Sequence, residues 1–495
     1  MSKLGSLFKD TVIYGMSSIV GRFLNYLLVP LYTAKMSVES GEYGVVTNMY
    51  AWTALILMIL VFGMETTFFR FADKEKGNVS KVFSMCMQVI ALLCAMFLTG
   101  VFCGIDSLAG LLGYADHPEF ITMMAVVVAL DALQAIPFGL LRFQGRAMKF
   151  ASLKMLNILT NIALNLIVFL LLPLLYEQHP DIVGSFYSPG NQSYYVFLIN
   201  LLCTSFITLF FIPELKMYRP TGDTTLLKKM LSYSWPLLLL GIAGILNLNA
   251  DKILYPQLVP GQQGKMELSI YGAAVKIAAI MAMLMQAFRY AYEPFVFGNR
   301  DKKDSKALYA KAMKFFIIVS LMAFLCVVFY MDLIKHIINP GYWEGLKVVP
   351  YIMAAEIFMG VYFNLSFWYK LNDETWWGAI FSFTGCALLF AVNIIFVPRY
   401  GYMACAWASF SAYFVAMTMS YFVGRKRNPI EYDLKGIAGY LLLFGALYTV
   451  SALLPVESVA VRLTFNTLLL AVYVAYFVRK DLPLKNIPFV NRFFK

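Results

Sequence analysis

Charged residues are scarce in this chain. Only 14% of its 495 residues are Asp, Glu, Lys or Arg, whereas 60% are hydrophobic, and the mean hydropathy is +0.70. Soluble domains carry about 25% charged residues, so a soluble protein of this composition could not cover its surface with polar groups. The composition excludes a soluble enzyme or binding domain and predicts an integral membrane protein.

Residues that carry catalysis or bind metals are also few. The three His residues (His117, His179 and His336) lie far apart in predicted loops, and the seven Cys residues form no CxxC pair. Such spacing indicates neither a metal site nor a disulfide framework. The chain has no GxxxxGK[ST] phosphate loop, and its longest predicted outer loop, about residues 176–194, is short. We therefore predict no enzyme activity, no catalytic residues, no metal and no cofactor.

Long apolar runs make up most of the chain. A helix needs about 20 apolar residues to cross a bilayer core, and about fourteen runs approach or exceed that length. The prediction is an all-α integral membrane protein with about 14 transmembrane helices. The predicted spans cover approximately residues 11–35, 44–67, 82–103, 119–141, 155–175, 194–214, 230–250, 268–297, 310–331, 347–368, 376–397, 402–424, 436–454 and 459–479.

Lys and Arg residues gather on one side of these spans. Because cytoplasmic loops carry an excess of Lys and Arg, this bias predicts that both termini are cytoplasmic. The net charge of +12 therefore reflects the Lys and Arg residues of cytoplasmic loops, and we expect no nucleic-acid partner. The exceptions to the bias are Lys35, Lys252, Lys265, Lys335, Lys347, Arg399 and Arg462 outside, and Arg22, Lys276 and Arg289 within spans.

The chain shows signs of an internal repeat. Tyr43-Gly44 opens the second span and Tyr271-Gly272 opens the eighth, while Asn165 in the fifth and Asn393 in the eleventh have the same separation. Spans one and seven run in the same direction, so the repeat is parallel. We predict two six-helix bundles, residues 1–220 and 221–430, followed by two additional helices and a basic tail over residues 431–495. Transporters with such repeats bind substrate between the halves, near the middle of the membrane.

Three cations inside predicted spans are candidate substrate ligands. Arg22 lies near the middle of the first span, and Lys276 and Arg289 lie in the eighth. A charge at that depth costs roughly 2.5–3.5 kcal/mol on insertion scales, so such a span is expected to face protein or a watery cavity. Arg22 either pairs with a carboxylate to hold helices together or meets an anion. Arginine suits phosphate oxygens because its planar fork binds them in a bidentate manner.

Four carboxylates are candidates for ion coupling or for charge pairing with these cations. Asp131 and Glu356 lie in the middle of the fourth and tenth spans, at nearly corresponding places in the two halves. Asp251 ends the seventh span, and Glu65 lies near the inner end of the second. The sequence leaves open whether they bind a coupling cation or sugar hydroxyls, or neutralise nearby Lys and Arg.

At this point the chain resembles the polysaccharide-export branch of the MOP superfamily, over nearly its whole length. The resemblance is carried by SSIVGRFLNYLLVPLYT from Ser17, SVESGEYGVV from Ser37, LLRFQGRAMKFASLKMLNIL from Leu140, LSYSWPLLLLGIAGILNLNADKIL from Leu231 and IYGAAVKIAAI from Ile270. It implies a Wzx-type flippase with a MATE-like fold. Such a protein moves undecaprenyl-diphosphate-linked oligosaccharide from the cytoplasmic to the outer leaflet by alternating access, for O-antigen or another surface glycan.

The same resemblance implies the setting and a role for one residue. Arg22 lies in the matching first helix, and related lipid II flippases use cavity arginines. We expect a monomer in the bacterial cytoplasmic membrane that contacts membrane lipids and works beside the glycan polymerase and glycosyltransferases of its pathway. The driving force is left open between a Na⁺ gradient, a H⁺ gradient and the membrane potential. The alternative is a cation-coupled multidrug exporter of the MATE type, which would use Asp131 and Glu356 in place of a central arginine.

Overall fold

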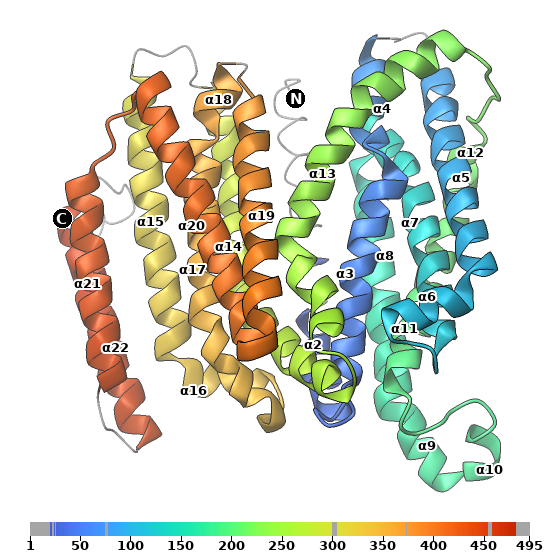
Figure 1. Cartoon of the computed structure of the whole chain (residues 1–495), viewed down its shortest axis with the longest axis horizontal. Helices are drawn as coiled ribbons and strands as arrows, with labels where there is room; N and C mark the ends of the chain where they lie inside the picture. The colour runs from blue at the N-terminus through green and yellow to red at the C-terminus, as the bar shows by residue number, and fades with distance from the viewer. Residues whose placement is uncertain are drawn as a thin grey trace. The chain divides into compact units, whose positions relative to one another are not determined.

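The computed structural model is helical throughout its described residues, as predicted (Figure 1). It describes residues 20–21, 24, 26–74, 78–298, 304–372, 374–453 and 458–481, with backbone alone at 291, 293–295 and 297–298. In these ranges there are helices and loops but no β-strand. Arg22 and about half of the first predicted span lie outside the described residues, so the predictions made for them stay predictions.

The chain forms long helices joined by short connections, several of which contain a further short helix. The helices before residue 260 are α2 (Leu28–Lys35), α3 (Glu42–Val61), α4 (Met64–Lys74), α5 (Val79–Cys103), α6 (Ile105–Leu112), α7 (Pro118–Phe143), α8 (Ala147–Leu166), η1 (Ile167–Leu171), α9 (Leu172–Gln178), α10 (Pro180–Val183), α11 (Gln192–Leu209), α12 (Ile212–Leu215) and α13 (Thr224–Leu258). The later ones are α14 (Gln262–Gly298), α15 (Ser305–Phe329), α16 (Met331–Ile334), η2 (Lys335–Ile337), η3 (Pro340–Val348), α17 (Val349–Leu365), α18 (Phe367–Leu371), α19 (Trp376–Tyr400), α20 (Tyr402–Arg427), α21 (Leu434–Leu453) and α22 (Val459–Lys480).

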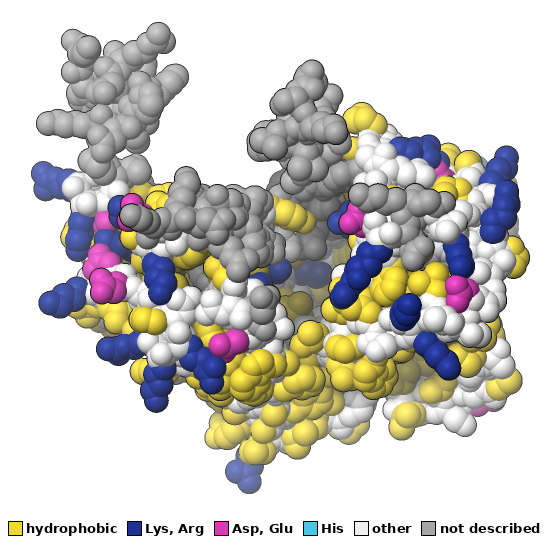
Figure 2. Space-filling model, turned by 90° about the horizontal axis from the view of Figure 1, so that it is seen from above, with side chains coloured by type: hydrophobic (Ala, Val, Ile, Leu, Met, Phe, Trp, Pro, Cys, Tyr) yellow, Lys and Arg dark blue, Asp and Glu magenta, His cyan; other side chains and the backbone are white. Residues whose placement is uncertain are grey.

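Thirteen helical segments in the described residues are long and apolar enough to span a membrane. They correspond to the second to fourteenth predicted spans. A bilayer interior offers no water to satisfy backbone N–H and C=O groups, so spans must satisfy these groups internally, as helices do. The chain is therefore a multi-pass integral membrane protein. Figure 2 shows Lys and Arg side chains gathered on the face seen from above, where α5, α13 and α15 begin and α20 ends.

The chain forms two compact units, and each is described on its own. Unit 1 comprises Met1–Ala273 and Cys386–Ala408, and unit 2 comprises Ala274–Gly385 and Ser409–Lys495. A division into compact units does not test whether the chain contains an internal repeat. The lobes predicted over residues 1–220, 221–430 and 431–495 therefore stay a prediction.

The core of unit 1 surrounds α7. This helix packs against α3, α5 and α11, and it is the most buried of the candidate spans in the described residues. Phe68, Phe83, Ile90, Ile136 and Leu140 are fully buried or nearly so in the cluster where α4, α5 and α7 meet. The second predicted span is broken between α3 and α4, where Phe62 and Gly63 both have positive φ, 51° and 67°. This break changes the direction of the chain just before Glu65.

In unit 2, the two last helices pack on α15. The Lys314 ammonium on α15 lies 2.8 Å from Asp433, just before α21, and 2.5 Å from Asp481, at the end of α22. Tyr440 on α21 also donates a hydrogen bond to Asp481, at 2.7 Å. The Lys314 ammonium, with help from the Gly436 N–H, holds the pKa of Asp433 below its ordinary value. One lysine thus anchors both C-terminal helices at the same end.

Candidate functional site

The two candidate cations of the eighth span lie on different faces of α14. Lys276 and Arg289 are thirteen residues apart, which at 3.6 residues per turn places them about 140° apart around the axis and about 20 Å apart along it. Lys276 is exposed within its unit, whereas Arg289 is half-buried. Helix geometry therefore does not bring these two side chains to a common point, and one phosphate group could not bridge them.

Arg289 instead belongs to a cationic–aromatic cluster within unit 2. Its guanidinium carbon lies 4.5 Å from the centre of the Phe363 ring. The ammonium of Lys370 lies 4.8 Å from the same ring and 4.9 Å from Phe367. Two cations can approach one another because the ring face between them carries partial negative charge. Lys370 was not among the candidate site residues of the sequence, and it lies on α18, which follows α17.

Unit 1 contains a charged cluster that includes Asp131 and Glu65. Asp131 on α7 is half-buried, receives a hydrogen bond from Thr204 on α11, and interacts with the ammonium of Lys154 on α8. Lys154 also interacts with Glu65 on α4 and lies 4.0 Å from the centre of the Phe138 ring. Glu65 accepts a hydrogen bond from Arg142 at 2.8 Å. Two carboxylates and two cations from three helices thus lie in one balanced network.

Lys154 was missed as an interior residue because the fifth span was predicted to begin at residue 155. The helix begins at Ala147, so Lys154 lies two turns inside it. The signal was present in AMKFASLKMLNIL, where apolar residues at helical spacing start at Ala147. The run of basic residues before it favoured a cytoplasmic loop, and this moved the predicted boundary too far along the chain.

We predict that Lys154 and Asp131 are energetically coupled. Lys154→Gln should lower the thermal stability of the protein in detergent because it leaves two carboxylates near each other without their shared cation. The double variant Lys154→Gln/Asp131→Asn should recover part of the loss, giving a coupling energy of about 0.5–3 kcal/mol in a double-mutant cycle. Lys229→Gln, at an exposed lysine of α13, is the matched control. Strictly additive effects would show that the two side chains do not interact.

Asp251 is held by two donors within unit 1. Its side chain is nearly buried, accepts a hydrogen bond from the Tyr271 hydroxyl at 2.5 Å, and lies 3.1 Å from the Lys252 ammonium. A carboxylate that is satisfied in this way gains little by binding a mobile cation. Glu356, the fourth candidate carboxylate, is half-buried on α17 of unit 2 and is not without a partner. Within unit 1, Asp131 and Glu65 thus share one network, whereas Asp251 has partners of its own.

The predicted outer ends of α3 and α14 make a close contact in unit 1. The Gly44 N–H donates a hydrogen bond to the Ser269 hydroxyl at 2.7 Å. A Cβ atom on Gly44 would lie 2.2 Å from the Lys265 carbonyl oxygen, and one on Gly272 would lie 2.5 Å from the Thr47 hydroxyl oxygen. Both helices therefore need glycine at the crossing, since any side chain would separate the backbones.

A second group of polar contacts lies beside this crossing. Asn48 on α3 donates a hydrogen bond to the Lys252 carbonyl of α13 at 2.7 Å, and the Tyr114 hydroxyl donates to Asn48 at 2.8 Å. Gln262 at the start of α14 donates to the Glu39 carbonyl at 2.6 Å. The first third of the chain and the segment from α13 to α14 are thus joined at the end predicted to be outer.

Two asparagines that the sequence paired share one kind of hydrogen bond. Asn165 on α8 and Asn393 on α19 are both fully buried. Each donates its amide to the carbonyl four residues earlier, Asn165 at 2.8 Å and Asn393 at 2.9 Å. Gly44 and Gly272, the other predicted pair, both lie at the crossing of α3 and α14.

A family model for polysaccharide biosynthesis proteins matches residues 7–294, more than half of the chain. The chain belongs to this family. The expected resemblance to the polysaccharide-export branch of the MOP superfamily is thereby confirmed. The family and the fold are those of membrane transporters rather than enzymes. None of the curated protein sequences matches the chain significantly.

Solved structures with similar folds support the same architecture. A lipid II flippase MurJ in an inward closed conformation has a TM-score of 0.73 at 13% identity, covering 95% of this chain and 99% of its own. An inward-facing multidrug resistance MATE transporter of the MOP superfamily has a TM-score of 0.61 at 15% identity, covering 82% and 94%. A MOP superfamily transporter from Pyrococcus furiosus has a TM-score of 0.52 at 15% identity, covering 85% and 95%. At these identities the likeness shows the fold alone.

Proposed function

We propose that this transporter is a flippase for polyprenyl-diphosphate-linked oligosaccharide, and that it carries its cargo from the cytoplasmic to the outer leaflet of a bacterial cytoplasmic membrane. The observation that carries the proposal is the polysaccharide biosynthesis family match over residues 7–294. The MurJ-like fold supports it, because that protein is a flippase of a lipid. The positive-inside bias supports cytoplasmic termini.

The distribution of charge favours an anionic cargo. A diphosphate cannot cross hydrocarbon bare, since an isolated charge there costs tens of kcal/mol in the Born limit. Cations within spans lower that barrier, and this chain has three of them within predicted spans, Arg22, Lys276 and Arg289. With a negative cell interior, outward movement of negative charge is favoured by about 2.3 kcal/mol per charge per 100 mV. The membrane potential therefore favours the loaded step, and any charge that the empty carrier moves on its return offsets this gain.

The competing function, export of cationic drugs, is disfavoured by the surroundings of the carboxylates. A site for a drug cation needs a carboxylate whose charge is available. Glu65 is bonded to Arg142, Asp251 to Lys252, and Asp131 interacts with Lys154. A drug would have to displace an attached ammonium or guanidinium in each case, which costs affinity.

The contact between α3 and α14 supports alternating access. Gly44 and Gly272 bring the two backbones together at the predicted outer end, where a hydrogen bond from Gly44 to Ser269 joins them. We infer that this contact closes the outer end of the pathway and must separate to release the cargo.

The test is flipping by the purified full-length protein in proteoliposomes. The substrate is a fluorescent polyprenyl-diphosphate oligosaccharide, and a cationic dye is measured in parallel. Protein-dependent loss of the glycolipid from the leaflet of origin supports the proposal. Dye efflux without glycolipid movement would overturn it in favour of a drug exporter.

We predict that Asp131 and Glu356 affect flipping through ion coupling only if a cation drives the cycle. In that case Asp131→Asn/Glu356→Gln should remove the dependence of the flipping rate on the Na⁺ or H⁺ gradient, since a neutral amide cannot replace the charge of a carboxylate. Flipping is measured with and without each gradient at a constant membrane potential. An unchanged gradient dependence in the double variant would assign both carboxylates to charge pairing.

A further inference from the structure

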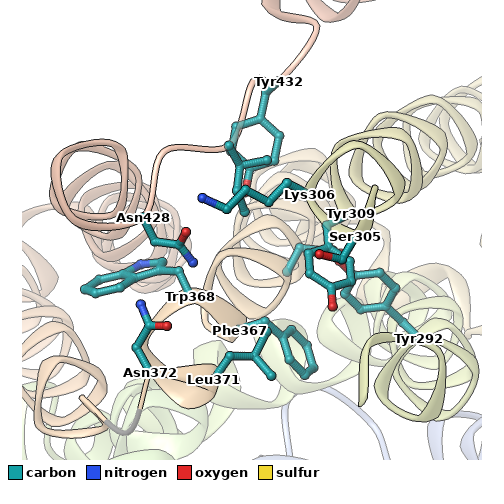
Figure 3. A pocket seen from close by; sticks show the side chains of 12 residues that line it. Tyr292, Ser305, Lys306, Tyr309, Phe367, Trp368, Leu371, Asn372, Asn428 and Tyr432 are labelled. Carbon is teal, nitrogen blue, oxygen red and sulfur yellow. The ribbon is translucent and has the colours of Figure 1, made fainter. Parts of the chain in front are cut away.

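Unit 2 contains a polar cavity and an apolar cavity that share one residue. The polar cavity has a volume of about 220 Å³ and lies between the end of α14, the start of α15, the α17–α18 junction and the segment after α20 (Figure 3). The apolar cavity has a volume of about 390 Å³ and lies between α15, α17, α20 and α21. Tyr432 lines both, so the two cavities adjoin at this residue.

The polar cavity contains a buried acceptor that has no partner. Asn364 is only 4% exposed and donates its amide to the Gly360 carbonyl at 2.9 Å. Its side-chain oxygen is buried without a hydrogen-bond partner among the described residues. Asn364 is one of the residues that line the cavity. Buried polar atoms are nearly always paired, and an exception points to a missing ligand or water. The atom needs a donor, such as a hydroxyl group.

The same cavity offers a cation and further amides. The Lys306 ammonium donates one hydrogen bond to the Pro429 carbonyl, at 3.1 Å, and an ammonium has three donors in total. Asn372 and Asn428 lie on either side of the Trp368 indole, and Lys306 extends toward the same space (Figure 3). A cation with amide donors suits a phosphate, while the Asn364 oxygen suits a hydroxyl. The combination matches a phosphorylated polyol.

The apolar cavity suits a hydrocarbon chain. Its lining is almost entirely apolar and includes Phe324, Ile357, Leu365, Leu441 and Phe444. A cavity of about 150 Å³ holds one benzene, so about 390 Å³ holds roughly fifteen carbon atoms. That is the size of one fatty acyl chain, whereas most of a long polyprenyl chain would remain outside.

We propose that the two cavities bind one anionic glycerophospholipid of the inner leaflet. Its phosphate lies near Lys306, a headgroup hydroxyl donates to Asn364, and one acyl chain fills the apolar cavity. Lys306 lies at the predicted cytoplasmic end of α15, where the headgroups of that leaflet are found, and basic pockets on this side of membrane proteins bind anionic lipids. The proposal does not rest on the transport function, because this lipid is a bound component rather than the cargo.

The experiment is native mass spectrometry of the purified full-length protein titrated with phosphatidylglycerol, phosphatidylcholine, polyprenyl phosphate and soluble glycerol 1-phosphate. Phosphatidylglycerol should bind at least tenfold more tightly than the other three. Lys306→Gln should weaken its binding about tenfold and Asn364→Leu several-fold. Leu441→Trp, which narrows the apolar cavity, should weaken the binding of phosphatidylglycerol but leave the binding of glycerol 1-phosphate unchanged.

Lys311→Gln is the matched control, since Lys311 is exposed on α15 and does not line either cavity. Asn364→Leu changes a buried residue. If that variant fails to fold, Lys306→Gln still tests the proposal. Equal binding of phosphatidylglycerol and phosphatidylcholine would overturn the headgroup assignment. Binding of glycerol 1-phosphate as tight as that of phosphatidylglycerol would overturn the role of the apolar cavity. Tighter binding of polyprenyl phosphate would assign the site to the cargo and overturn the proposal.

Discussion

Gly44→Leu is expected to reduce glycolipid flipping at least tenfold and to hold the predicted outer end open. Even the first side-chain carbon would lie 2.2 Å from the Lys265 carbonyl oxygen and 2.9 Å from the Ser269 nitrogen. Both are backbone atoms of α14, so the two helices must move apart. Overpacking of this kind typically costs 1–3 kcal/mol, and here the cost falls only on the closed arrangement. The measurement is flipping in proteoliposomes, with equal amounts of inserted protein.

The open state can be detected separately. Thr47→Cys places a thiol at the crossing, where the Thr47 hydroxyl oxygen would lie 2.5 Å from a Gly272 Cβ, and Cys103→Ser removes the exposed native thiol. In this background a membrane-impermeant maleimide added to cells should label Thr47→Cys at least tenfold faster when Gly44→Leu is present. Gly100→Leu is the control, because a Cβ on Gly100 meets nothing within 4 Å. Equal labelling with and without Gly44→Leu would show that the crossing does not close the outer end.

The span pattern could be predicted from sequence because it depends on one property, the length of apolar helix that covers a bilayer. Thirteen described segments match thirteen predicted spans for that reason. The ends of spans were less predictable. Lys154 was placed outside a helix that in fact begins at Ala147, since a basic residue near a span end is compatible with a loop or with an interior position. The break at Phe62–Gly63 has no sequence signature beyond a single glycine.

The partners of the candidate charges could not be predicted, because packing determines them. The Arg289–Phe363–Lys370 cluster joins residues that are distant in sequence. The Lys154 interactions with Asp131 and Glu65 likewise join three helices. Sequence spacing alone gives the relative positions only of residues on the same helix. The angle between Lys276 and Arg289 around the axis of α14 is an example. The glycines at the α3–α14 crossing were found in the sequence as a repeat, but their contact required the structure.

Arg22→Ala is expected to abolish export of the glycolipid while leaving membrane insertion intact. Among the three cations within spans, Arg22 lies in the segment that resembles the first helix of the polysaccharide-export branch. A hydrogen bond to a charged group contributes about 1.5–3 kcal/mol, so losing both bonds of a bidentate pair with a diphosphate lowers transport by a factor of about 100 to over 10,000. Arg22→Lys keeps the charge but loses the planar fork, and it should retain partial activity.

The measurement is surface glycan in cells and flipping in proteoliposomes, both normalised to inserted protein. Lys35→Ala is the matched control, because Lys35 is an exposed cation at the predicted outer end of the same span. If Arg22 only pairs with a carboxylate to hold helices together, Arg22→Ala should lower thermal stability, and flipping per folded molecule should stay normal. Normal stability with lost flipping would place the arginine at the cargo. Normal surface glycan in Arg22→Ala would remove it from the transport pathway.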